Sequence, residues 1–185
     1  MNTSTVTTVH TLGPPGTNCE SAARHWLLRQ QGDGSEVVLH DSLEEAVDAM
    51  LAEPRESALV GCIVYPRLHE IVFQHLDDMV LSECFVLPTH SMVLAAPSAT
   101  SVVRTVASHS APVNLLDGLD VTIVPSASNS GAALTCARGE TDACITTDVA
   151  ARANQLAVLH DFGPVAMGFS VHVARRDREP RQGLT

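Results

Sequence analysis

Short apolar runs alternate along this chain with segments whose apolar residues recur at helical spacing. The apolar runs predict strands at residues 6–12, 36–40, 58–64, 79–87, 91–95, 102–108, 121–124, 143–146, 157–160 and 169–174. The helically spaced segments predict helices at 17–31, 43–51, 66–75, 111–116, 128–138 and 147–154. Strands that alternate with helices are typical of an α/β architecture with a mostly parallel sheet.

Local signals support two of these helices. The apolar positions Ala22, Ala23, Trp26 and Leu27 form one face of the helix at 17–31. Ser42, with Glu45 three residues later, predicts a capping box at the start of the next helix.

Charge and composition exclude several classes of function. The chain of 185 residues carries 21 acidic and 11 basic residues, a net charge of −10, so a nucleic-acid-binding face is not expected. The 5 cysteines are odd in number and scattered, which favours reduced thiols and a cytoplasmic location. The start MNTSTVTT has no signal-peptide pattern, and no apolar run reaches the ~18 residues of a membrane span. Nine histidines show no metal-binding spacing, so no metal is expected.

One turn concentrates the features of an anion-binding loop. The segment TLGPPGTNCESAA, residues 11–23, joins the first strand to the first helix. Gly13 and Gly16 permit close backbone approach and positive φ. Thr17 and Asn18 then lie at a helix N-terminus, where free N–H groups and the helix dipole favour an anion. A plain helix cap by Thr17 is the alternative interpretation, and an inert thiol is favoured at Cys19.

Two later turns repeat this arrangement, in ASHSAPVNLL (107–116) and PSASNSGAALTCA (125–137). Each places small polar residues between a strand and a helix, at the sheet edge where open α/β sheets bind ligands. Ser108 and His109 are candidates to position or protonate a substrate, and Ser128 and Asn129 are candidates to bind it. Loop and cap roles remain the alternatives for all four. The expected ligand is small and anionic.

These motifs resemble the catalytic domain of the prephenate dehydratase family. TLGPPGTNCESAA resembles its opening turn, VASHS its serine-histidine motif, SASNSGAA its serine-threonine helix start, and LAVLHDFGPVAMGFSVHVA its closing strand. HTLGPPGT, VVLHDSLEEAV and SHSAPVNLL are similar to the prephenate decarboxylase branch, the bacilysin-pathway type found in antibiotic gene clusters.

The resemblance implies a two-lobe α/β fold like that of type II periplasmic binding proteins, with the active site between the lobes. Lobe one is expected at 1–89 plus 168–185 and lobe two at 90–167, with crossing strands at 91–95 and 169–173. The tail at 175–185 is expected to be disordered, and the regulatory domain that often follows is expected to be absent.

The closing strand departs from the dehydratase pattern. Dehydratases carry threonine-arginine-phenylalanine where this chain has Met167, Gly168 and Phe169. Without that hydroxyl and guanidinium, the triplet offers no acid to protonate a departing ring hydroxyl. Met167 and Phe169 are therefore candidate apolar contacts to the substrate, with core packing as the alternative.

A second departure follows the third predicted strand. Dehydratases have a proline-x-glutamate-asparagine-serine motif where this chain has GCIVYPRLHEIV, which lacks the acid and the amide. Tyr65 is a candidate donor to the substrate, and a half-buried structural tyrosine is the alternative.

The resemblance thus implies a lyase of secondary metabolism without a cofactor. The preferred activity is non-aromatising decarboxylation of prephenate to a dihydro-hydroxyphenylpyruvate. Two alternatives stay open: a dehydratase or isomerase acting on another small ring acid, of cyclohexadienyl or tropone-precursor type, and a non-catalytic binding protein for an aromatic acid. The expected partner is the small anionic substrate, with neither nucleic acid nor membrane, and a homodimer is left open.

Overall fold

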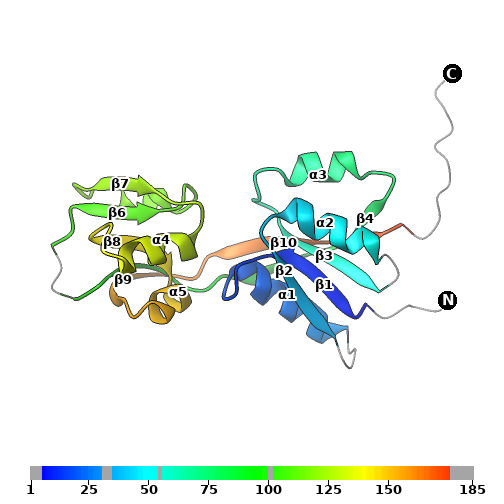
Figure 1. Ribbon diagram of the computed structural model, residues 1–185, viewed down its shortest axis with the longest axis horizontal. Coiled ribbons are helices and arrows are strands. Elements are labelled where there is room, and N and C mark those ends of the chain that lie inside the picture. The colour runs from blue at the N-terminus through cyan, green and yellow to red at the C-terminus, as the bar shows by residue number, and fades with distance from the viewer. Residues whose placement is uncertain (1–5, 31–34, 54–55, 100–101, 176–185) are drawn as a thin grey trace, which may run out of the picture. The chain divides into compact units, whose positions relative to one another are not determined.

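The computed structural model describes residues 6–30, 35–53, 56–99 and 102–175. The chain divides into two compact units: unit 1 is Met1–Leu87 with Met167–Thr185, and unit 2 is Pro88–Ala166 (Figure 1). The chain therefore passes from unit 1 to unit 2 and returns once. The lobe boundaries expected at 89/90 and 167/168 stay a prediction.

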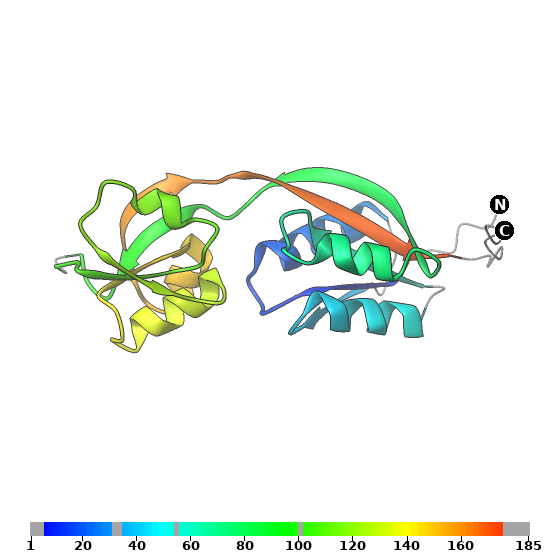
Figure 2. The ribbon, with the colours of Figure 1, turned by 90° about the horizontal axis from the view of Figure 1, so that it is seen from above.

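Unit 1 contains, in the described part of the chain, a five-stranded sheet of order β2-β1-β3-β10-β4. Its strands are β1 (Thr8–Leu12), β2 (Glu36–His40), β3 (Ser57–Cys62), β4 (Met79–Pro88) and β10 (Ala166–Ala174). Strand β1 pairs in parallel with β2 and β3, whereas β10 pairs antiparallel with β3. Figure 2 shows β10 and β4 side by side in this sheet.

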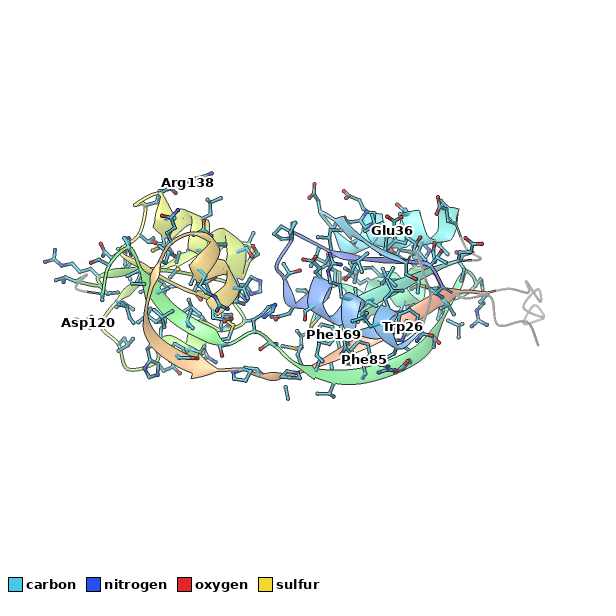
Figure 3. The ribbon with its side chains drawn as sticks, turned by 90° about the horizontal axis from the view of Figure 1, so that it is seen from below. Trp26, Glu36, Phe85, Asp120, Arg138 and Phe169 are labelled. Carbon is cyan, nitrogen blue, oxygen red and sulfur yellow. The ribbon has the colours of Figure 1, made fainter. Side chains whose placement is uncertain are left out.

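Helices cover both faces of the unit 1 sheet. Helix α1 (Asn18–Arg29) buries the four apolar residues that the sequence pattern predicted, and they join a cluster with Val60, Phe169 and Val171. Trp26, Phe85 and Phe169 gather in this part of unit 1 (Figure 3). The other face carries α2 (Leu43–Ala52) and α3 (Leu68–Gln74), which pack on Leu59 and Met79.

The predicted cap of α2 is confirmed. Ser42 lies at the N-cap, and its hydroxyl accepts a hydrogen bond from the Glu45 backbone N–H at 3.2 Å. Helix α3 begins at Leu68, later than the sequence indicated, because the residues after β3 form a turn in which the Leu68 N–H donates to the Tyr65 carbonyl at 3.0 Å.

Unit 2 contains a second five-stranded sheet among its described residues, of order β7-β6-β8-β5-β9. The strands are β5 (Met92–Ala96), β6 (Thr105–Ser108), β7 (Thr122–Pro125), β8 (Ala143–Thr147) and β9 (Ala157–Gly163). Helices α4 (Asn129–Ala137) and α5 (Asp148–Ala153) pack on one face around Ala107 and Cys144. The 3-10 helix η1 (Val113–Leu116) packs on the other through Leu116.

Both sheets are mixed, so the expectation of a mostly parallel sheet is only partly right. Strands β6, β7 and β8 pair in parallel, but β5 pairs antiparallel with both β8 and β9. The expectation that residues 91–95 cross between the lobes is wrong. These residues overlap β5, which is a strand of the unit 2 sheet. Strand β4 instead carries the chain to the boundary, since it continues unbroken to Pro88.

Two further observations concern the chain as a whole. The tail at 175–185 lies outside the described residues except for Arg175, whose side chain donates to the Leu76 carbonyl at 3.0 Å. None of the described helices combines the length and the apolar character that crossing a membrane requires.

Candidate active site

The sequence-predicted residues of unit 1 lie at one edge of its sheet. Parallel pairing brings the carboxyl ends of β1, β2 and β3 to the same edge. Because β10 runs antiparallel to β3, its first residues reach that edge as well, with Phe169 opposite Cys62. The turn after β1, Tyr65 after β3 and Met167 on β10 therefore belong to a single edge.

The two glycines of the first turn are needed for different structural reasons. The Gly13 N–H donates to the His40 carbonyl at 2.8 Å, and a Cβ at Gly13 would lie 3.3 Å from that same oxygen. Gly16 has φ +80°, a conformation that favours glycine. The predicted close approach and positive φ are both confirmed, one at each position.

Thr17 caps helix α1. Its hydroxyl accepts from the Glu20 N–H at 3.3 Å and lies 3.4 Å from the Leu12 carbonyl, to which it donates. The Glu20 carboxylate reaches back to accept from the Gly16 N–H at 2.6 Å and also binds Arg24 at 2.7 Å. A carboxylate of the protein therefore already stands at this helix start, with Asn18 as the first helical residue.

The sequence pattern contained a signal for Glu20. Thr17 and Glu20 have the spacing of a capping box, the same spacing that identified Ser42 and Glu45. The chemical role of the turn depends on this carboxylate, because it already occupies the Gly16 N–H that an anionic ligand would otherwise use.

Cys19, next to the turn, is not a reactive thiol. Burial raises its pKa to about 12, with a further contribution from the neighbouring Cys62. The side chain packs against the apolar cluster under α1. It stays protonated at neutral pH and acts as a small apolar group.

Tyr65 has a partner of its own. Its hydroxyl donates to Glu44 Oε2 at 2.8 Å, and its ring packs against the cluster under α2 and α3. Burial and the hydrogen bond to Glu44 raise the pKa of Tyr65. Arg67 pairs with the other Glu44 oxygen at 3.0 Å. This network favours a structural role for Tyr65 over proton donation to a substrate.

The three residues that replace the dehydratase triplet differ in exposure. Phe169 is 1% exposed, and its ring stacks on Phe85 with centroids 5.7 Å apart, which favours core packing over contact with substrate. Met167 is half-buried at the margin of the same cluster. Gly168, between them, lies under the side chain of Ile63, whose Cδ1 would be 2.3 Å from a Cβ at this position.

In unit 2 the structure brings the predicted residues together. Ser108 ends β6 opposite Pro125 of β7, and its carbonyl accepts from the Ser126 N–H at 2.9 Å. The buried Ser108 hydroxyl donates to the His109 carbonyl at 2.9 Å. His109 Nδ1 accepts from the Ala111 N–H at 3.2 Å, so the neutral ring carries its proton on Nε2.

The start of α4 lies beside this pair. Ser128 is the N-cap and accepts from the Gly131 N–H at 2.9 Å. A Cβ at Gly131 would lie 2.9 Å from the Ser126 hydroxyl, so the glycine leaves room for the serines. Asn129 Oδ1 is buried and has no hydrogen-bond partner among the described residues, while Nδ2 has only Met92 Sδ at 4.0 Å. The Asn129 amide thus has hydrogen-bonding capacity left for a ligand.

Two other features were missed from the sequence. His10 Nδ1 lies 3.0 Å from His40 Nε2, a pair beneath the first turn that separate strands bring together. Ile63 lies over Gly168. Within the described ranges, no three His, Cys, Asp or Glu side chains gather as a metal site would require.

Comparison with known proteins decides the family. The family model for prephenate dehydratase matches residues 9–162. The chain belongs to the prephenate dehydratase family. The resemblance seen in the motifs is therefore confirmed.

Two relatives named prephenate decarboxylase agree with this family. A prephenate decarboxylase of Bacillus subtilis strain 168 is 29% identical over 181 residues, which cover 89% of this chain and 85% of that protein. A prephenate decarboxylase of Planktothrix agardhii is 27% identical over 176 residues, covering 88% and 86%.

Three solved structures share the fold. The prephenate dehydratase of Staphylococcus aureus Mu50 has a TM-score of 0.60 at 14% identity and covers 91% of this chain and 68% of its own. A periplasmic substrate-binding protein of an ABC transporter from Coxiella burnetii has 0.57 at 15%, covering 95% and 88%. GqqA, described as a novel type of quorum quenching acylase, has 0.62 at 16%, covering 95% and 67%. The predicted type II periplasmic-binding-protein-like fold is confirmed.

Proposed function

We propose that this member of the prephenate dehydratase family is a lyase that decarboxylates prephenate and retains the ring hydroxyl, giving a dihydro-hydroxyphenylpyruvate. The similarity to relatives named prephenate decarboxylase supports the substrate and the reaction. We further propose that it acts in the cytoplasm, in secondary metabolism of the antibiotic type, and without a cofactor.

The observation that carries the proposal is the absence of an acidic or hydroxyl side chain at Met167 and Gly168, near the start of β10. These two residues are called the Met167–Gly168 corner. Dehydration needs an acid that protonates the departing hydroxyl. Neither residue offers one, and the side chain of Ile63 occupies the space over Gly168. Decarboxylation needs no such acid, and an apolar surface disfavours hydration of the carboxylate that is lost.

The reaction balances without a co-reactant. The bond between the ring and its carboxylate breaks and CO₂ leaves. The electron pair passes through the ring diene, and one proton joins the far diene carbon. In this proposal the doubly protonated His109 ring supplies that proton from Nε2, and its Nδ1 no longer accepts from the Ala111 N–H while the ring is charged. Ser108 fixes the loop through its bond to the His109 carbonyl.

The remaining candidates would bind the substrate's carboxylates and ring. Asn129, with its unpaired amide oxygen, and Ser128 contribute polar contacts from unit 2. Thr17 and Asn18 contribute the start of α1, where Glu20 is the competing carboxylate. Met167 contributes an apolar contact, supported from the core by Phe169.

Incubation of the pure protein with prephenate, with product analysis by NMR, tests this function. A non-aromatic product that keeps the ring hydroxyl supports it. Phenylpyruvate would indicate a dehydratase. Unchanged prephenate would indicate a dehydratase or isomerase of another small ring acid, which the missing acid and amide after β3 would favour, or a binding protein.

A further inference from the structure

The end of β3 presents apolar side chains where a polar loop is usual. Ile63 is 53% exposed and Val64 is 59% exposed, directly after β3 and at the sheet edge that carries the Thr17 turn. The backbone is anchored here, because the Ile63 N–H donates to the Gly168 carbonyl at 3.1 Å. The apolar surface is therefore held in place by the sheet.

Gly168 is explained by Ile63 and not by its backbone. Gly168 is absent from the described glycines with positive φ, so its conformation admits any residue. A Cβ would nevertheless meet Ile63 Cδ1 at 2.3 Å and Cγ1 at 3.0 Å. A side chain at this position would therefore require the half-exposed end of the Ile63 side chain to move.

Both faces of β10 are covered by apolar side chains at residues 167–169. Side chains alternate along β10, and Met167 and Phe169 belong to the cluster under α1. Ile63 covers the opposite side, over Gly168. A ring acid that approaches this edge would meet methyl groups and no charge from this pair of residues.

We propose that Ile63 is a specificity-determining residue: held over Gly168, it contacts the ring of the substrate and keeps water from the carboxylate that is lost. This inference rests on the proposed function and deepens it. The pair Ile63 and Gly168 selects a reaction that proceeds in an apolar environment over one that needs a proton donor at the same corner.

Two substitutions of nearly equal shape test the contact. Ile63→Val keeps an apolar side chain, and Ile63→Thr has the shape of the valine variant with one of the valine methyl groups exchanged for a hydroxyl. Since the side chain is half exposed, both variants should unfold at the wild-type temperature. We expect kcat/KM for prephenate to be about 10-fold lower in Ile63→Thr than in Ile63→Val. Val80→Thr, at the start of β4, is the matched control and should leave kcat/KM unchanged.

Prephenate binding, measured by calorimetry on the same proteins, separates the two hypotheses. If the wild type converts prephenate but the two Ile63 variants are equal, the inference is overturned and the proposed function stands. If the wild type binds prephenate without converting it, and Ile63→Thr binds it about 10-fold more weakly than Ile63→Val, the contact stands and the function is wrong. If the wild type neither converts nor binds prephenate, both are overturned.

Discussion

The carboxylate of Glu20 accepts a hydrogen bond from the backbone N–H of Gly16 at 2.6 Å. Its side chain is 14% exposed, so a protein anion shares the start of α1 with any ligand carboxylate bound by Thr17. Like charges that share one helix start repel each other, so the turn that resembles an empty anion site is already partly occupied by Glu20.

Removal of this charge should strengthen substrate binding. Glu20→Gln keeps an oxygen that can accept from Gly16 but loses the negative charge. A charge at a helix start contributes about 0.3–1 kcal/mol, so we expect KM for prephenate to fall about two- to fivefold and α1 to lose a similar amount of stability. Glu36→Gln, at the start of β2, is the control for net charge. Equal KM values in the two variants would place the substrate carboxylates away from Thr17.

The proton donor can be tested at His109. His109→Asn retains a side chain that can accept from the Ala111 N–H and so preserves the loop. We expect kcat to drop by about 10²–10⁴ while KM changes little, because the variant lacks the donor at Nε2. Steady-state kinetics and a thermal melt check this together. An unchanged kcat would mean that His109 is a structural residue of the loop and not the proton donor.

Stability should decrease in acid because buried histidines must stay neutral. Burial lowers the pKa of His172, and burial with the neighbouring His40 lowers the pKa of His10, against the opposing carboxylates of Glu53 and Glu36. In the unfolded chain these two histidines bind protons near the ordinary histidine pKa of about 6.5. The folded state is therefore favoured fully above that pH, and this contribution to stability is lost as the pH falls through the lower pKa values of the folded state.

Urea unfolding at several pH values measures this effect. The free energy of unfolding should fall below about pH 6.5, by at most about 1.4 kcal/mol per pH unit for each such histidine. His172→Phe should flatten this dependence, whereas His69→Gln, at an exposed position of α3, should not. Identical slopes in all three proteins would mean that other groups set the acid sensitivity.

Restoring the dehydratase triplet requires the Ile63 side chain to move or to be shortened. Met167→Thr with Gly168→Arg should destabilise the protein, because the new Cβ meets Ile63 Cδ1 at 2.3 Å. Adding Ile63→Ala should recover stability and allow some phenylpyruvate to form from prephenate. Product analysis of the double and triple variants checks this. A triple variant that folds but forms no phenylpyruvate would mean that Ile63, Met167 and Gly168 do not determine which reaction the protein catalyses.

Local signals were sufficient for much of the fold. Apolar periodicity located α1 and its buried face, and the spacing of Ser42 and Glu45 located the start of α2. The mixed sheets were not predictable in the same way, because strand direction depends on the return of β10 from unit 2 and not on any residue within β10.

In the candidate site too, local signals in the sequence revealed some residues, and contacts between distant segments could not be predicted. Ser108, His109, Ser128 and Asn129 were predictable because each lies at or next to the end of a strand or the start of a helix, and the sequence shows where elements end. The partners that limit other candidates are distant in sequence: Tyr65 meets Glu44, and Gly168 meets Ile63. Such tertiary contacts leave no periodic pattern.

The fate of the ring hydroxyl oxygen tests the central proposal most directly, since dehydration and simple decarboxylation of prephenate both release CO₂. Prephenate labelled with ¹⁸O at the ring hydroxyl would be incubated with the protein and its products analysed by mass spectrometry. We predict that the label stays in a non-aromatic dihydro-hydroxyphenylpyruvate. Recovery of the label in water, together with unlabelled phenylpyruvate, would contradict the account.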